Sequence, residues 1–446
     1  MPSRSKQNEG TRLAPSCSPG KPTNARPAEV RLFEVTDRSE TQDADPDPAA
    51  LAGVSPGWRV LVGRDRRPIG VRLTLNRTGA AAPVMSELLD SVLAGCTSEA
   101  DGRPVFPQGL IVLSPRNLEA DPAMSSWRAP RNVLLEFGQG DLDDERWLRR
   151  MFEIQKQGVR IALRLDQPLA PPSERLPYFQ YLVASSRGAV APTVDPANVS
   201  ILTLDDSTHQ QIDADFAAGV HATAGWPLEA IRRPEPRGLT PAQTAVFELI
   251  RLVQANADVR MLEQVFRGEP LLAYLLLTLA NSAALRRSAP VSSLSHAISV
   301  LGYQRLIKWL VLLLAIAGKE PGIAPLVYVA VVRGHLMENL LTAARRSRAE
   351  RDDAFIVGTF SLLDAITGQP LSDLLRDMRL SAPITDALLA SSGPLAPLIS
   401  IARGFEAADP LNLVRIRAEL SVDSADANRA LLQALATADS LQSLIQ

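Results

Sequence analysis

Cysteine and histidine are both scarce in this sequence. Its 446 residues include only 2 cysteines, Cys17 and Cys96, and 4 histidines. The two cysteines are far apart and form no CxxC spacing, which favours free thiols in a reducing cytoplasm over a disulfide framework or a zinc site. No group of residues has the spacing of a metal-binding motif, so we expect neither a metal nor a cofactor.

An excess of either charge is missing as well. The chain carries 47 lysines and arginines against 49 aspartates and glutamates, a balance that argues against a nucleic-acid partner. Its longest apolar run, Trp309–Ala317, has nine residues, whereas a membrane span needs roughly 20. No apolar stretch follows the first basic residues, as a secretory signal requires. We therefore expect a cytoplasmic protein that has no membrane partner.

Residues 1–54 have a composition of their own. Pro, Ser, Asp, Asn and Arg dominate there, and no apolar period persists. Such a segment cannot bury enough apolar surface to offset the entropy that is lost on ordering. We predict a disordered N-terminal tail over residues 1–54, with at most a short strand near Val30–Val35.

Residues 55–224 alternate between strand and helix patterns. Two period-two runs begin at Trp58 and flank Arg64–Pro68, which predicts a hairpin. The alternation that follows favours parallel strands with crossover helices, an α/β fold. The expected strands are Gly109–Ser114, Val133–Phe137, Arg160–Leu165, Tyr181–Ala184 and Ser200–Leu204, and the expected helices are Ser86–Ala94 and Asp144–Gln157.

The Pro-rich composition of residues 225–239 predicts an extended linker, and residues 240–446 are predicted to be an all-helical domain. Thr240 is placed to cap the first helix, Pro241 to occupy its first position and Gln243 to complete a capping box. The next helix ends near Gly268. Beyond residue 350 the expected helices are Phe355–Ile366, Leu371–Arg379, Ala382–Ala390, Leu395–Phe405, Asp409–Leu420 and Ala425–Leu444.

The helical region is organised around Leu271–Ala317. Five leucines of its first helix share one face: Leu271, Leu272, Leu275, Leu276 and Leu279. A second helix ends at Gly302, and a third follows. Helices with such wide apolar faces are not stable alone, so they must pack against one another and against further helices. Leu276 and Leu310 are therefore expected in the interior.

Several segments of this region resemble the HDOD domain, an all-helical relative of the HD phosphohydrolases. The similar segments are LLLTLANSAAL, PVSSLSHAISVLG and RLIKWLVLL, in this order. Further on, DDAFIVGTFSLLDAITGQPLSDLL resembles the region downstream of HDOD in bacterial proteins that carry a degenerate EAL domain before it. The resemblance implies a two-domain signalling protein.

The α/β region in turn resembles the EAL domain. LVGRDRRPIGVRLTLNR is similar to the opening hairpin of that domain, and VLLEFGQGD and GVRIALRLDQ resemble the next two landmarks in order. An active EAL domain is a modified (β/α)8 barrel that hydrolyses cyclic di-GMP. It uses carboxylates at the strand ends to hold two divalent metal ions.

Residue by residue, the resemblance implies a degenerate site. The glutamate of the EAL tripeptide falls on Arg72, and the asparagine of the next strand falls on or beside Val112. Glu136 is retained, but the paired aspartates fall on Arg164 and Leu165. Cations at positions 72 and 164 would repel metals, and Glu136 is expected to pair with one of these arginines. After residue 204 too few residues remain for the last barrel elements, so we predict a truncated, degenerate EAL-like domain.

Hydrolysis of the HD type is not expected either. HD phosphohydrolases need spaced histidines and a His-Asp pair as metal ligands. Here His296 and His335 are followed by Ala and Leu, and Asp364 with Ala365 falls where an active relative carries its His-Asp pair. We therefore expect no catalytic residue, and we predict that the chain is not an enzyme.

A candidate interaction surface lies around the turn that follows residue 280. It comprises Asn281, Ser282, Arg286, Arg287 and Lys308. The pair Asn281-Ser282 can instead have a structural role, ending the helix and bonding a neighbouring loop. The three basic residues make a small patch that suits a phosphate or an acidic peptide, and the alternative is a solvated face.

These observations together predict non-catalytic signal transduction. By resemblance, proteins with this domain pair act as adaptors or regulators in signalling that touches cyclic di-GMP, and they bind partner signalling proteins through the HDOD domain. The alternative is a sensor that binds cyclic di-GMP without hydrolysing it. The sequence leaves the partner, the signal and the oligomeric state open, a homo-oligomer included.

Overall fold

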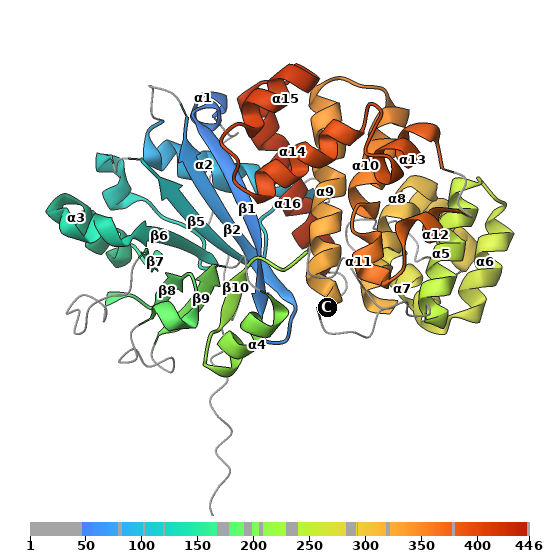
Figure 1. Ribbon diagram of the computed structural model, residues 1–446, viewed down its shortest axis with the longest axis horizontal. Coiled ribbons are helices and arrows are strands. Elements are labelled where there is room, and N and C mark those ends of the chain that lie inside the picture. The colour runs from blue at the N-terminus through green and yellow to red at the C-terminus, as the bar shows by residue number, and fades with distance from the viewer. Residues whose placement is uncertain are drawn as a thin grey trace, which may run out of the picture. The chain divides into compact units, whose positions relative to one another are not determined.

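Eight strands in the first half of the chain close into a barrel (Figure 1). The computed structural model describes residues 47–78, 83–100, 103–118, 121–166, 178–190, 199–204, 208–228, 240–281, 291, 293–317, 322–376 and 380–443. Around the barrel the strand order is β1-β10-β9-β8-β7-β6-β5-β2. β1 is antiparallel to both neighbours, and the other pairs are parallel. The bounds are β1 Val54–Gly63, β2 Pro68–Arg77, β5 Leu110–Arg116, β6 Val133–Gly138, β7 Arg160–Leu165, β8 Tyr181–Ala184, β9 Ser200–Leu204 and β10 Ala222–Ala224.

The predicted α/β character is confirmed, but the predicted truncation is wrong. Strands β7, β8 and β9 have the bounds expected from the sequence. After β9, helix α4 (His209–Ala217) and strand β10 supply the elements that seemed to be missing. β10 closes the barrel by pairing Ala224 with Leu61 of β1. Its three residues, Ala-Thr-Ala, are too few and too weakly β-forming to be recognised as a strand from sequence.

Helices and short turns connect the strands. Helix α2 (Met85–Gly95) lies between β2 and β5, and α3 (Glu145–Lys156) lies between β6 and β7, as the sequence predicts. Among the described residues, this half also contains a small hairpin and short 3-10 turns: β3 Ser98–Ala100, β4 Arg103–Val105, η1 Pro122–Ser126, η2 Gln139–Asp143 and η4 Arg187–Ala189.

The predicted N-terminal tail ends earlier than expected. Helix α1 (Pro48–Ala52) lies inside the range 1–54 assigned to the tail, is capped by the Asp47 side chain and buries Leu51. A helix of five residues leaves no apolar period in the sequence, and α1 is buried by its contacts with α2 and α16. Residues 1–46, with the strand expected near Val30–Val35, lie outside the described residues.

Helices make up the second half of the chain. As predicted, Thr240 and Gln243 form a reciprocal capping box, with N–O distances of 3.2 and 2.9 Å. α8 leaves helical geometry at Gly302 (φ 70°, ψ 160°), the residue expected to separate two helices. The helix expected over Phe355–Ile366 is divided between α10 and α11. The bounds are α5 Pro241–Gln254, α6 Val259–Gly268, α7 Pro270–Ala280, α8 Leu294–Ala317, α9 Ile323–Ala343, α10 Arg348–Phe360, α11 Leu363–Thr367, α12 Leu371–Arg376, α13 Ala382–Leu389, α14 Ala396–Glu406, α15 Asn412–Leu420 and α16 Ser424–Ser443.

The core of the helical half contains the two leucines predicted to be interior. Leu276 of α7 and Leu310 of α8 are both fully buried. The buried face of α7 is narrower than the sequence suggested, because Leu271 is exposed and Leu275 and Leu279 are only partly buried. α9 is buried along nearly its whole length and contacts both α10 and α16.

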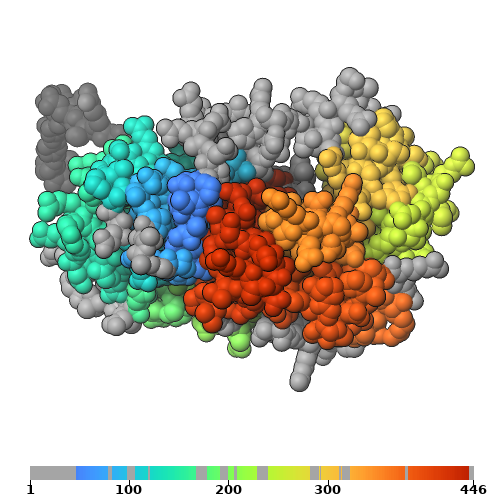
Figure 2. All heavy atoms as spheres, turned by 90° about the horizontal axis from the view of Figure 1, so that it is seen from above, coloured from blue at the N-terminus to red at the C-terminus, as the bar shows by residue number. Residues whose placement is uncertain are grey.

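The barrel and the helices share one packing interface. Helices α9, α14 and α16 all contact β1, and Figure 2 shows the blue start of the barrel beside the red C-terminal helices. The Asn428 side chain of α16 donates to the carbonyls of Leu51 and Val54 at 2.7 and 2.8 Å. Further along α16, Asp439 accepts from the amides of Gln108 and Gly109 at 2.9 and 3.3 Å. Hydrogen bonds near both ends of α16 therefore connect this helix to the barrel half of the chain.

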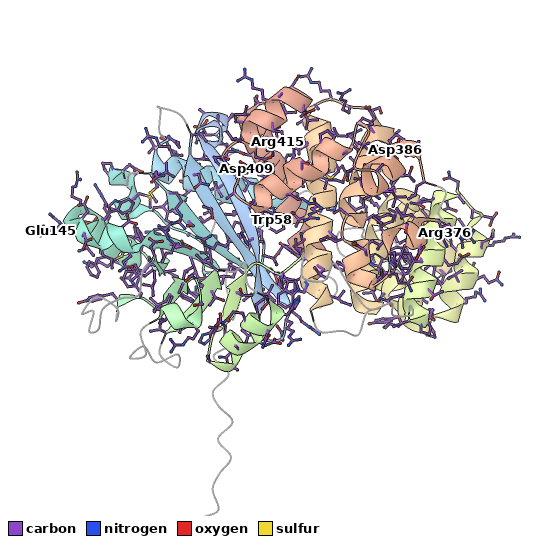
Figure 3. All side chains as sticks on the ribbon, in the orientation of Figure 1. Trp58, Glu145, Arg376, Asp386, Asp409 and Arg415 are labelled. Atoms are coloured by element: carbon purple, nitrogen blue, oxygen red, sulfur yellow. The ribbon has the colours of Figure 1, made fainter. Side chains whose placement is uncertain are left out.

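Tight contacts support the same interface. A β-carbon at Gly57 of β1 would collide with Ala408, which follows α14. Trp58, labelled in Figure 3, places its ring 6.3 Å from that of Tyr328 on α9.

Trp226, at the start of the predicted linker of residues 225–239, is buried and packs its ring edge-on against His209 at 5.0 Å. Among the helices built from described residues, none has the length and hydropathy of a membrane span.

Candidate functional site

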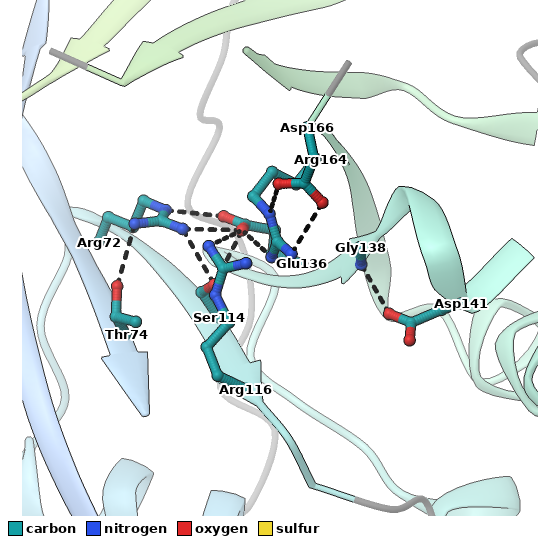
Figure 4. Close-up of polar contacts among 9 residues, drawn as sticks. All are labelled: Arg72, Thr74, Ser114, Arg116, Glu136, Gly138, Asp141, Arg164 and Asp166. Atoms are coloured by element: carbon teal, nitrogen blue, oxygen red, sulfur yellow. Dashed lines mark hydrogen bonds and ion pairs between the residues drawn. The ribbon is translucent and has the colours of Figure 1, made fainter. Parts of the chain in front are cut away.

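The interior of the barrel holds a buried carboxylate surrounded by arginines (Figure 4). Arg72 comes from β2, Glu136 from β6 and Arg164 from β7. Successive side chains of a strand point to opposite faces of the sheet. Residues two positions apart therefore share a face, whether they are polar or apolar. Glu136 and Arg164 lie toward the carboxyl ends of β6 and β7, and Arg72 lies midway along β2. In barrels of this kind the carboxyl end carries ligand sites.

Glu136 accepts hydrogen bonds from several donors. The Arg72 guanidinium contacts both carboxylate oxygens, at 2.7 and 2.8 Å. The Ser114 hydroxyl donates to Oε1 at 2.8 Å, and Arg164 donates to the same oxygen at 3.2 Å. Arg116 forms a longer ion pair with it at 3.5 Å. The prediction that Glu136 pairs with Arg72 or Arg164 is confirmed, and it pairs with both.

Burial explains why so many donors are needed. The Glu136 and Arg72 side chains are almost completely inaccessible, and a charge in such surroundings is tolerated only when it is paired and hydrogen-bonded. Arg72 is also bonded to the hydroxyls of Thr74 and Ser114, at 3.0 and 2.9 Å. Ser114 and Arg116 were missed by sequence reasoning. They are polar residues at alternate positions of the apolar strand β5, which is the only signal that pointed to them.

The rim of this cluster carries more charge. Arg164 also donates to Asp166 at 2.8 and 3.2 Å. Asp141 accepts from the Gly138 amide at 2.7 Å, and burial, together with the nearby Asp166 and Asp144 charges, raises the pKa of Asp141. The other two positions singled out by the resemblance, Val112 and Leu165, are buried in the core, and their apolar side chains offer no ligand atom.

Arginine outnumbers carboxylate around Glu136. Arg72, Arg116 and Arg164 face Glu136, and among the described residues only Arg164 has a second carboxylate partner, Asp166. Arg116 is the most accessible of the three. Guanidinium groups with spare donors bind phosphate oxygens well, because their geometry suits two parallel hydrogen bonds. The arrangement is suited to holding an anionic group at the barrel end. Within the described residues, no three His, Cys, Asp or Glu side chains are grouped as metal ligands.

Of the predicted interaction surface, Asn281 has the structural role given as the alternative. Its side-chain amide donates to the carbonyls of Leu277 and Val291 at 2.8 and 2.9 Å, and its oxygen accepts from the Val291 amide at 2.8 Å. It thereby joins the end of α7 to the segment before α8. Ser282, Arg286 and Arg287 lie outside the described residues.

Lys308 does not belong to an open basic patch, which corrects the prediction. Its ammonium group is partly buried, forms an ion pair with Glu338 at 2.6 Å and lies over the Phe355 ring. His335 Nδ1 lies 3.4 Å from the same glutamate. Burial opposes ionisation of Glu338, but His335 and Lys308 lower its pKa to about 2. The cation at position 308 is needed inside the bundle, because without it the Glu338 carboxylate would be an unpaired charge.

His335 and Asp364 also make contacts within the helical half. Burial lowers the pKa of His335, and its ring lies 5.0 Å from Phe355. Asp364, which with Ala365 falls where active HD relatives are expected to carry their His-Asp pair, accepts from the backbone amide of Ala365 at 2.8 Å. Cys96 is a buried free thiol, as predicted, and Cys17 lies outside the described residues.

Comparison with known proteins addresses the helical half directly. Residues 239–359 match the HDOD domain. The resemblance in LLLTLANSAAL and the segments after it is thereby confirmed, and α5–α9 with most of α10 make up the matched HDOD region. The helices from α11 onward lie beyond it.

Two curated proteins are similar to parts of the chain. The cyclic di-GMP phosphodiesterase CdgJ of Vibrio cholerae is 28% identical over 212 residues, which cover 47% of this chain and 48% of CdgJ. The uncharacterized protein YuxH of Bacillus subtilis is 21% identical over 164 residues, 36% of this chain and 40% of YuxH. The chain thus spans about half of these relatives or less. No solved structure matches.

The similarity to CdgJ supports a link to cyclic di-GMP signalling. It also contradicts the prediction that this chain is not an enzyme, because CdgJ is named as a phosphodiesterase. That prediction rested on the arginines at positions 72 and 164, where the resemblance led us to expect metal ligands. Their presence removes one arrangement for binding a metal, but it does not determine the activity of the whole chain.

Proposed function

We propose that this protein is a regulator in cyclic di-GMP signalling that acts on partner signalling proteins through its HDOD domain. The HDOD match and the similarity to CdgJ support the signalling role. The observation that carries the proposal is that α9, within the HDOD match, also contacts strand β1 of the barrel. A ligand in the barrel and a partner on the HDOD helices would therefore act on one packed body.

The basic turn after α7 is the surface to test for partner binding. The sequence predicts that Arg286 and Arg287 are exposed, and exposed charges contribute little to stability. A double variant, Arg286→Ala with Arg287→Ala, should therefore lose partners captured from a bacterial lysate while keeping its melting temperature. The matched control is Arg345→Ala with Arg346→Ala, an exposed arginine pair in the turn after α9. If both double variants capture the same partners as the parent protein, the turn is not the binding surface.

A second candidate function is recognition of cyclic di-GMP in the barrel, and the arginine cluster around Glu136 favours it. A cyclic dinucleotide carries two phosphodiesters, each with two non-bridging oxygens that a guanidinium can bind through two parallel hydrogen bonds. Arg116 is the accessible member of the cluster and pairs with Glu136 only at 3.5 Å, so its donors can turn to a ligand at small cost.

Calorimetric titration with cyclic di-GMP tests this second function. Arg116→Ala should weaken binding about 10-fold or more, since a hydrogen bond to a charged group is worth roughly 1.5–3 kcal/mol. Arg149→Ala, an exposed arginine on α3, is the matched control and should bind as the parent does. Absence of heat with the parent protein excludes the second function. Product analysis of the same samples with Mg²⁺ or Mn²⁺ measures hydrolysis directly, and Glu136→Ala tests whether any turnover depends on the cluster.

A further inference from the structure

A groove lies between helices α12, α13 and α14 and the turn that joins α10 to α11 (Figure 1). Its volume is about 420 Å³, within the range of roughly 300–1,000 Å³ that is common for sites of small molecules. All of its described lining residues follow residue 359, where the HDOD match ends, and none of them belongs to a strand. The groove is therefore separate from the barrel cluster around Glu136.

One wall of the groove is a face of α14, formed by Ala396, Ile399, Ser400 and Arg403. Their spacing of i, i+3, i+4 and i+7 places them on the same side of the helix. The remaining residues of α14 are mostly buried, and the helix contacts β1, α9 and α10. Because these contacts hold the helix in position, a ligand does not have to order this wall when it binds.

The lining at Ser361 is held in place by buried hydrogen bonds. The Ser361 hydroxyl donates to the Gly358 carbonyl at 2.7 Å and accepts from Arg333 Nη1 at 3.0 Å. Arg333 is only 3% exposed, and it donates to both carboxylate oxygens of Glu406 on α14, at 2.6 and 2.7 Å. Its charge is thereby compensated within the protein.

A second wall is the turn between α13 and α14, which carries Ser391 and Ser392. The Ser392 amide donates to the Asp386 carbonyl at 3.1 Å. A left-handed backbone at Ser391 (φ 50°) and at Gly393 (φ 79°) lets the chain reverse after α13. Both serines are exposed, and each hydroxyl can rotate to donate to a ligand. The turn therefore adds two donors to the groove.

The charge of the groove is positive. Among the described residues that line it, Arg403 is charged, and no aspartate or glutamate is present. A guanidinium has five N–H donors, so it can bond to a neighbouring group and to a ligand at the same time. Ser400 is exposed three residues before Arg403 and places a hydroxyl beside it. This set of donors suits an anion and does not suit a cation.

We propose that the groove binds a phosphate monoester with a short aliphatic body. The three terminal oxygens of a phosphate point in different directions, so donors on the turn and on α14 can bind it together. A carboxylate has only two oxygens in one plane, and a single guanidinium occupies both. Leu371, Leu388 and Ile399 line the same groove and supply an aliphatic surface for the rest of the molecule. This inference does not depend on the proposed function.

Calorimetric titrations of the full chain test the proposal with three probes: hexyl phosphate, inorganic phosphate and hexan-1-ol. Hexyl phosphate should bind about 10-fold more tightly than either of the other two, because each of those supplies only one part of the contact. Equal affinity for inorganic phosphate would mean an adventitious anion only, and equal affinity for hexan-1-ol would mean an apolar contact only. Either result overturns the proposal, and so does a parent protein that shows neither heat nor a higher melting temperature with hexyl phosphate.

Variants in the groove test where the probe binds. Arg403→Gln should weaken the binding of hexyl phosphate about 10-fold or more, since it removes hydrogen bonds to a charged group. Ser400→Trp fills the groove and should abolish binding. Arg417→Gln, an exposed arginine on α15, is the matched control and should bind as the parent does. All three positions are exposed, so melting temperatures without a probe should stay unchanged.

The arginine cluster of the barrel is the competing site for a phosphate, and Arg116→Ala separates the two. Weaker binding of hexyl phosphate by Arg116→Ala, with unchanged binding by Arg403→Gln, assigns the probe to the barrel and overturns the proposal. Unchanged binding by both variants overturns it as well. Weaker binding by both means that the chain has two such sites, of which the groove is one.

Discussion

Replacing Glu136 by leucine should destabilise the protein more than replacing Arg72 by methionine. Both side chains are buried and share two hydrogen bonds, at 2.7 and 2.8 Å. Without Glu136, Arg72 keeps only the hydroxyls of Thr74 and Ser114 as partners. A buried guanidinium then has no counter-charge, and breaking a buried ion pair in this way costs about 3–5 kcal/mol.

When Arg72 is removed, Glu136 keeps more partners for its charge than Arg72 keeps when Glu136 is removed. Arg164 and Arg116 remain at 3.2 and 3.5 Å, and the Ser114 hydroxyl still donates at 2.8 Å. The loss is then that of hydrogen bonds to a charged group, roughly 1.5–3 kcal/mol. The double variant removes both charges and places Leu beside Met. Its cost should fall below the sum of the two single costs by about 0.5–3 kcal/mol.

Urea unfolding, followed by circular dichroism, measures these free energies by linear extrapolation. Arg149→Met is the control, because Arg149 pairs with Glu145 only at 3.9 Å on the exposed side of α3, where an ion pair contributes about 0–1 kcal/mol. A larger loss for Arg72→Met than for Glu136→Leu refutes this reasoning. Strict additivity in the double variant refutes it as well, because it would mean that the two side chains do not interact.

Three further results are expected. Leu276→Ala and Leu310→Ala should each lower the free energy of unfolding by about 2–5 kcal/mol, since both leucines are fully buried; losses under about 1 kcal/mol in urea would contradict their place in the core. Thr240→Ala should cost about 1 kcal/mol by removing the cap on the Gln243 amide, and Thr240→Ser should keep it; equal losses for the two variants in thermal melts would exclude the cap. Burial raises the pKa of Cys96 from 9.0 to about 12, so in Cys17→Ser protein a thiol reagent at neutral pH should react only after unfolding. Stability should also fall between pH 9 and pH 12, because the unfolded thiol ionises first; rapid labelling of the native protein would contradict both statements.

Part of the candidate site could be predicted and part could not. Arg72, Glu136 and Arg164 were identified through the resemblance to the EAL domain. Opposite charge on the neighbouring strands β6 and β7 favours the pair Glu136–Arg164, whereas Arg72 on β2 reaches Glu136 across β5. Ser114 and Arg116 belong to the same site, but a serine and an arginine near a strand end are common at any surface. Only the register of β5 against β2 and β6 brings them to Glu136.

Lys308 illustrates the opposite error. Grouped with Arg286 and Arg287 it suggests a basic patch, but it lies on α8, and the neighbouring helix α9 presents Glu338 to it. The partner of a charge on a helix is set by the helix packed against it, thirty residues away in this case. The residues close to Lys308 in the sequence therefore do not indicate that it pairs with Glu338.

By itself, the sequence determined what depends on neighbours a few residues apart. The bounds of β7, β8 and β9, the capping box at Thr240 and the break at Gly302 all follow from periodicity, side-chain caps and backbone freedom. The tertiary structure decided what depends on distant pairs. β10 is a strand only because β1 and β9 lie on either side of it, and α1 is a helix buried by α16, more than 370 residues away. The exposure of Leu271 and Tyr274 on α7 has the same origin, since an apolar face is buried only where another element reaches it.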